Sequence, residues 1–123
     1  TDSTLQDALA RIASRTTGVQ VNFTVTGDSR ELPVTTSAEL VRITQSTLAN
    51  VTRHAQASRA DLTLTFLPDS VLLDIVDDGV GFDPASAGFG LTVLKDRVAA
   101  IGGKVTIESS AGAGTAVAVE VPS

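Results

Sequence analysis

The sequence predicts an α/β sandwich of the α+β type, in which three helices lie on one face of a mixed, mainly antiparallel sheet. Segments with apolar residues at helical spacing alternate with segments in which every second residue is apolar, in the order helix, strand, helix, two strands, helix, two strands. Hydrophobic residues make up 42% of the chain and aromatic residues only 3%, so Val, Leu, Ile and Ala side chains must form the core. The 123 residues fit one domain, residues 1–123.

The first three elements are a helix, a strand and a longer helix. Residues 4–15 place apolar side chains at helical spacing, and Ser3 or Thr4 is a suitable N-terminal cap. Residues 19–27 alternate apolar and polar side chains, which indicates a half-buried strand. Residues 37–55 repeat apolar side chains along one stripe and predict one long helix.

The second half of the chain predicts two hairpins separated by a helix. Pro68, Asp69 and Ser70 are turn-forming residues between two strand-like runs, and Gly102 and Gly103 end the helix. The expected ranges are 60–67 and 71–77 for the first hairpin, 91–101 for the helix, and 104–110 and 115–122 for the last hairpin.

Charge and composition exclude several classes of protein. The net charge of −5 argues against a nucleic-acid surface, because phosphate backbones are held mainly by clustered Lys and Arg. Without cysteine there is no disulfide and no thiolate metal site. No apolar run approaches the ~20 residues of a membrane span, so we expect no membrane contact by this segment. The absence of Met indicates a piece of a longer protein.

A row of polar residues lies on the long helix. Ser46, Asn50 and His54 are spaced four apart and share one stripe, with Arg53 beside it. Such a row is usually a solvated surface, but Asn has poor helix propensity in a helix interior and its place needs a reason. Its amide oxygen is a competent ligand for Mg²⁺.

The segment VDDGVGF follows a predicted strand and places a carboxylate where a core residue is expected. The alternation that starts at Val71 puts Asp77 on the core face. A buried carboxylate is costly unless it accepts hydrogen bonds, and the amine of adenine with an adjacent water can supply them. Gly79 and Gly81 allow the backbone to approach a flat ring. The alternative is a plain Asp-Gly turn at the end of a strand.

The segment GFGL opens the last predicted helix. A glycine-rich helix start offers free backbone N–H groups and the positive end of the helix dipole to an anion such as phosphate, although Gly88 and Gly90 also fit a simple tight turn. The small residues 83–88 between the two glycine segments fit a lid over a nucleotide.

In combination these motifs resemble the catalytic ATP-binding domain of sensor histidine kinases, a branch of the Bergerat-fold ATPases. The resemblance spans nearly the whole chain, and the RHA ending and short lid are most similar to kinases that pair with NarL-type response regulators. The matching segments are LANVTRHA, VDDGVGF, GFGLTVLKDRVAAIGG and GAGTAVAVEVP.

The resemblance implies a role for individual residues. Asn50 would coordinate Mg²⁺, Arg53 and His54 would approach the phosphates, and Asp77 would bind the adenine amine with Thr115 assisting through water. His54 is also explained as a cap at the helix C-terminus and Thr115 as a simple strand residue. The remaining cofactor-binding residues would be Gly79, Gly81, Gly88, Gly90 and Leu91.

One position departs from the family pattern. The family usually has Glu or Asn four residues before the helix Asn, where it assists the metal or orients the attacking group. This chain has Ser46 at that position, so Ser46 and Asn50 are the two catalytic positions that the resemblance implies. Gln45 lies about 100° around the helix and is a poor substitute. The phosphoacceptor histidine is also missing, because His54 is the only histidine. The segment is therefore expected not to autophosphorylate by itself.

The resemblance implies a protein-histidine kinase domain that donates the γ-phosphate of ATP to a histidine on a separate dimerisation domain. ATP, Mg²⁺, that phosphoacceptor domain and, through the full-length kinase, a response regulator are the expected partners, in the cytoplasm and without nucleic acid. Membrane anchoring of the parent is left open. Two alternatives are a degenerate nucleotide-binding regulatory module, suggested by Ser46, and an anti-sigma-factor serine kinase of the same fold.

Overall fold

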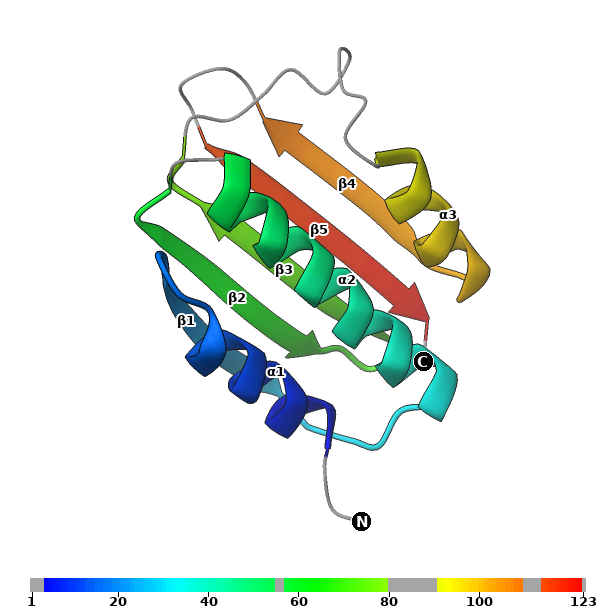
Figure 1. Ribbon diagram of the computed structural model, residues 1–123. Helices are drawn as coiled ribbons and strands as arrows, with labels where there is room; N and C mark the ends of the chain where they lie inside the picture. Colours follow the sequence, from blue (N-terminus) through cyan, green and yellow to red (C-terminus); the bar gives the residue numbers. More distant parts are fainter. Residues whose placement is uncertain (1–3, 55–56, 80–90, 110–113, 123) are drawn as a thin grey trace.

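A computed structural model describes residues 4–54, 57–79, 91–109 and 114–122, and it shows three helices against a five-stranded sheet. The predicted order of elements is confirmed. The elements are α1 (Leu5–Arg15), β1 (Gln20–Gly27), α2 (Val34–His54), β2 (Arg59–Phe66), β3 (Ser70–Asp77), α3 (Leu91–Ala100), β4 (Lys104–Ser109) and β5 (Thr115–Pro122). The expected layers are confirmed as well, since the helices cover one face of the sheet (Figure 1).

The sheet is mixed and mainly antiparallel, as predicted. Its strands lie in the order β1-β2-β3-β5-β4, with β1 and β2 parallel and the other neighbours antiparallel. A parallel pair needs a crossover connection, and α2 provides it between β1 and β2. The last of the described strands, β5, lies between β3 and β4 and is therefore an inner strand of the sheet, with β4 at the edge.

The core lies between the sheet and the helices. In β2, β3 and β5 every second side chain is buried beneath the helices, which is the period-two pattern of a sheet with one covered face. The largest buried side chains are Leu9, Leu40, Ile43, Leu62, Leu64, Val71, Leu73, Ile75, Val98, Val119 and Val121. None of the described helices is long and apolar enough to cross a membrane.

The helix ends depend on hydrogen bonds that the apolar pattern of the sequence does not predict. Of the two proposed caps, Thr4 is the one observed, and it forms a capping box with Asp7. The helix α2 begins three residues earlier than predicted, because Pro33 accepts a hydrogen bond from the Ser37 N–H at 3.0 Å and starts the first turn before the apolar repeat begins. Thr44 is fully buried in that helix, where its hydroxyl donates to the Leu40 carbonyl at 2.9 Å.

Candidate functional site

The candidate site lies at one end of the sandwich, shown at the top of Figure 1. There the C-terminal ends of α2 and β3 lie near the start of β5 and the N-terminal end of α3. Asp77 is the last residue of β3 and is paired with Thr115, the first residue of β5. The fold therefore gathers three of the motifs found in the sequence at a single end of the molecule.

Asp77 is buried on the core face of β3, as its alternation with Val71 predicted. Only 7% of the residue is exposed, and its carboxylate accepts a hydrogen bond from the Gly79 N–H at 2.8 Å. Burial raises the pKa of Asp77, while the Gly79 N–H and, more weakly, the Thr115 backbone N–H oppose that rise and the neighbouring Asp78 adds to it. A partly desolvated carboxylate with acceptor positions beyond these two donors is suited to bind a ligand N–H.

The start of β5 approaches Asp77 closely because of one glycine. Gly114 has a φ of +78°, and a Cβ there would lie 2.5 Å from the Asp77 carbonyl oxygen, so a larger residue would force the two strands apart. The next residue, Thr115, has its hydroxyl 2.9 Å from the Ser109 hydroxyl, which also donates to the Gly114 carbonyl at 3.0 Å. Ser109 thereby orients the Thr115 side chain at the edge of the site.

Asp78 ties the end of β3 to the start of β2. Its carboxylate accepts hydrogen bonds from the N–H groups of Ser58 and Arg59, both at 2.9 Å, and from the Ser58 hydroxyl at 2.8 Å. These bonds, the Arg59 N–H first, lower the pKa of Asp78. The residue was not identified from the sequence, and its only local signal is a second carboxylate directly after Asp77.

Ser46 and Asn50 are both exposed on α2, on the flank that faces α3. At about 100° per residue, Glu39, Ser46 and Asn50 fall within an arc of about 40°. Glu39 forms an ion pair with Arg97 of α3 at 3.3 Å, so this arc of α2 faces α3. The structure therefore brings together the two predicted catalytic positions on one open helix face.

The donor set around Asn50 is compatible with a magnesium ion that arrives with a nucleotide. No group of three or more His, Cys, Asp or Glu side chains is found within residues 4–54, 57–79, 91–109 and 114–122. Glu39 lies about three turns before Asn50 and is engaged by Arg97. Mg²⁺ commonly takes one or two protein oxygens and completes its shell with waters and phosphates, so the Asn50 amide oxygen fits that requirement.

Several predicted site residues lie outside the described part of the chain. These are Gly81, Gly88, Gly90 and the proposed lid at 83–88. The backbones of Arg53 and His54 form the last turn of α2, and Leu91 begins α3, but the side chains of these three residues are outside the described set. Their assigned contacts with phosphate therefore stay predictions.

Comparison with known proteins agrees with this geometry. The family of histidine kinase-, DNA gyrase B- and HSP90-like ATPases matches residues 35–123. Sensor histidine kinase LnrJ of Bacillus subtilis (strain 168) is 34% identical over 122 residues, which cover 97% of this chain and 30% of LnrJ. The chain thus spans less than a third of the length of that relative.

Solved structures share the fold. The histidine kinase domain of the Erythrobacter litoralis blue-light activated kinase is similar with a TM-score of 0.78 and 24% identity, over 97% of this chain and 61% of that one. Full-length ShkA, solved in complex with AMPPNP, is similar with a TM-score of 0.76 and 21% identity, over 96% of this chain and 29% of that one. Because the family match covers most of its length, the chain belongs to the histidine kinase-, DNA gyrase B- and HSP90-like ATPases, as an ATP-binding catalytic domain of the sensor histidine kinase kind.

Proposed function

We propose that the chain binds ATP together with Mg²⁺ at the end of the sandwich and presents the γ-phosphate to a histidine on a separate dimerisation domain. The observation that carries the proposal is the buried Asp77 carboxylate, which keeps acceptor positions beyond the N–H groups of Gly79 and Thr115. The exocyclic amine of adenine would donate to Asp77. Thr115, held by Ser109, would bind a water that bridges to the same base.

The phosphates would lie between the end of α2 and the start of α3. The N-terminal end of α3 points toward this end of the molecule (Figure 1), and the backbone N–H groups of a first helical turn favour an anion. Arg53 and His54 would approach the phosphates from α2, and Gly79, Gly81, Gly88, Gly90 and Leu91 would shape the pocket and its lid.

The chemistry would rest on positioning and charge, since the domain forms no covalent bond to the phosphoryl group. Asn50 would hold Mg²⁺ against the phosphates, where the ion would neutralise negative charge on the group being transferred. Ser46 stands one turn before Asn50, uncharged and exposed. It would reach the ion through water only.

The phosphoacceptor would come from outside this segment. The chain contains one histidine, His54, at the end of the helix that would contact the phosphates. The isolated domain would therefore fail to phosphorylate itself and would act on its own dimerisation and phosphoacceptor domain, with a response regulator reached through the full-length kinase. This activity would require a cytoplasmic location, where ATP and response regulators are found.

A second function is favoured only by Ser46. A hydroxyl at this position could mark a nucleotide-binding regulatory module without robust phosphotransfer. The two proposals differ in how binding depends on metal: a working kinase should bind ATP tightly only with Mg²⁺, whereas the regulatory module should bind it equally well without Mg²⁺.

Calorimetric titration of ATP into the chain and into Asp77→Asn and Asp77→Ala tests the adenine site. We expect binding to be lost in both variants, since a missing charge-assisted hydrogen bond with unpaired donors costs about 2–3 kcal/mol. Asp74→Asn is the matched control, because Asp74 lies on the same strand but on the opposite face and its change should leave ATP affinity intact. Unchanged affinity in the Asp77 variants would remove this residue from the site.

A further inference from the structure

A groove runs between α1 and α2 on the outer surface of the helical layer. The two helices run side by side in the same direction (Figure 1). Between their C-terminal halves lies an open hollow of about 470 Å³, with an apolar floor that includes the half-buried Ile12 and Val41. A second hollow of about 720 Å³ lies toward their N-terminal ends and shares Ala8 and Val41 with the first. The two neighbouring hollows are together called the α1–α2 groove.

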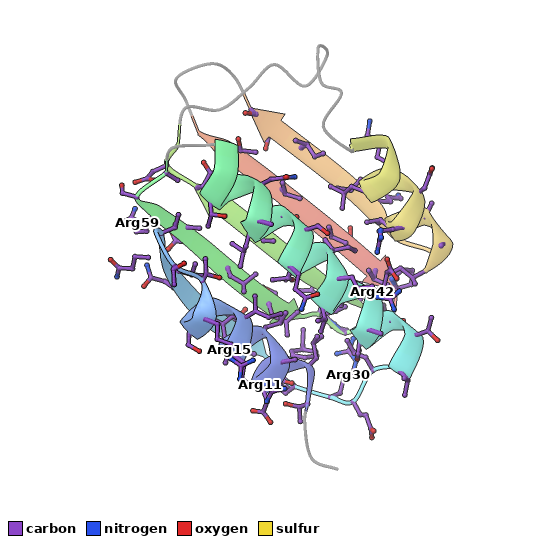
Figure 2. All side chains as sticks on the ribbon, viewed as in Figure 1. Arg11, Arg15, Arg30, Arg42 and Arg59 are labelled. Atoms are coloured by element: carbon purple, nitrogen blue, oxygen red, sulfur yellow. The ribbon has the colours of Figure 1, made fainter. Side chains whose placement is uncertain are left out.

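One end of the α1–α2 groove is positively charged. Arg11 and Arg15 lie one turn apart on α1 and both border the first cavity (Figure 2). Neither guanidinium group has an ion-pair partner among the described residues, and the described lining of this cavity contains no Asp or Glu. The chain as a whole carries a net charge of −5, so this end of the groove is opposite in sign to the rest of the protein.

The groove is separate from the nucleotide site. Gln45 and Thr52 of α2 border the first cavity, while Ser46 and Asn50 lie on the flank toward α3. Neighbouring residues of a helix point about 100° apart, so these two sets lie on different flanks of α2. A ligand in the α1–α2 groove would therefore contact a different flank of the helix that would hold Mg²⁺-ATP, without entering the proposed nucleotide pocket.

Helix stability accounts for only part of this arrangement. Arg15 lies in the last turn of α1, where a cation offsets the negative end of the helix dipole. That effect is confined to the last turn, and Arg11 lies one turn earlier. The apolar floor next to both side chains is also unexplained by the dipole. An apolar floor beside a cationic edge matches a ligand that has an apolar stripe bordered by acidic groups.

We propose that the α1–α2 groove docks an acidic amphipathic helix of a partner protein. A groove between two parallel helices accepts a third helix, whose apolar stripe would lie on the half-buried Ile12 and Val41. Glu or Asp side chains at the border of that stripe would pair with Arg11 and Arg15, which would fix the orientation of the helix and speed its association. The 11 residues of α1 extend for about 16 Å, so the partner helix needs about three turns.

The experiment is a selection of displayed helical peptides against this chain. The library keeps Leu or Ala at positions i, i+3, i+4 and i+7 and randomises the other positions over about 16 residues. We expect the selected peptides to be enriched in Asp and Glu beside the apolar stripe. Their affinity should fall about tenfold in the double variant Arg11→Glu/Arg15→Glu and should weaken as salt is raised. ATP binding by that variant should stay unchanged, which also shows that it folds.

The double variant Lys95→Glu/Lys104→Glu is the matched control, because it changes the net charge by the same amount at exposed positions on α3 and β4. It should bind the selected peptides as the original chain does. Recovery of neutral or basic peptides, recovery of none, or equal affinity for the Arg11→Glu/Arg15→Glu variant would each overturn the proposal. So would binding to phosphatidylglycerol vesicles that requires both arginines and occurs without selection of acidic helices, because the groove would then face a membrane.

Discussion

At the scale of single residues, the site depends on two adjacent carboxylates in opposite environments. Asp77 is buried and its pKa is raised, whereas Asp78 is exposed and its pKa is lowered by hydrogen bonds from Arg59 and Ser58. The same chemical group thus serves once as the proposed ligand site, at Asp77, and once as a structural contact between strands, at Asp78. Burial and the number of N–H donors decide which role each one takes.

The buried Asp77 carboxylate should destabilise the folded, nucleotide-free chain at neutral pH. Its pKa in the folded state lies above the ordinary value of 3.8, so the folded state is favoured when Asp77 is protonated and that advantage is lost as pH rises through the folded-state pKa. We therefore expect Asp77→Asn to raise the midpoint of thermal unfolding at pH 7. The gain should shrink as pH is lowered toward 3.8. A difference that stays constant over this range would contradict the assignment.

Ser46 is the residue at which this chain departs from its family. A hydroxyl is uncharged and shorter than a carboxylate, so it can reach Mg²⁺ only through water. Ser46→Glu should tighten Mg²⁺-ATP binding or speed phosphotransfer to a supplied dimerisation domain, by about 10–100-fold if the two groups share the ion. Gln45→Glu is the control on the other flank of α2 and should change neither quantity. If Ser46→Glu also changes neither Mg²⁺-ATP binding nor phosphotransfer, this helix face lies outside the metal site.

At the scale of elements, the site is held by contacts between strands that are distant in the sequence. Asp78 connects the end of β3 to residues 20 and 19 positions earlier, just after α2, and Gly114 brings β5 onto Asp77. The helix that would bind phosphate and the turn that would bind adenine are therefore joined through the short segment 57–59. Loosening either contact should weaken nucleotide binding without removing a ligand group.

Asp78→Asn should release the start of β2. The lowered pKa means that Asp78 stabilises the fold above its unfolded-state value of 3.8 and that this contribution is lost as pH falls through the lower folded-state pKa. In the variant, hydrogen exchange should be faster at the Ser58 and Arg59 amides and ATP affinity should fall. Asp69→Asn, in the turn before β3, is the control and should leave both measurements unchanged. If these two amides exchange as fast in the original chain as in Asp78→Asn, the hydrogen bonds to Asp78 do not stabilise the start of β2.

Gly114→Ala should destabilise the domain through a direct clash. The added Cβ would lie 2.5 Å from the Asp77 carbonyl oxygen, at a φ of +78° that L-residues rarely adopt, and we expect a loss of about 1–3 kcal/mol in the free energy of unfolding together with weaker ATP binding. Gly18→Ala is the matched control, since Gly18 has a φ of +84° but nothing within 4 Å of the added atom. Denaturant titration of both variants separates the clash from the backbone cost. Similar losses in the two would mean that β5 can move away.

At the scale of the whole molecule, the sequence predicted the parts that depend on local periodicity. The order of elements and the buried face of Asp77 follow from alternation and helical spacing, and both are confirmed. The position of β5 between β3 and β4 was not predicted, because a strand's neighbours are set by contacts that leave no local pattern. The tie at Asp78 and the close approach at Gly114 were missed for the same reason. The roles of Asn50, Ser46 and Thr115 stay predictions.

The position of β5 between β3 and β4 has a consequence for how the domain folds as it is synthesised on the ribosome. Residues 115–122 are the last of the described strands to be synthesised, yet they separate β3 from β4 in the finished sheet. Until they emerge from the exit tunnel, β4 has no neighbour and Asp77 lacks the backbone N–H of Thr115. A nascent chain that stops before residue 115 therefore has a split sheet and lacks the Thr115 part of the proposed adenine site, so we expect the domain to bind nucleotide only after β5 has been synthesised.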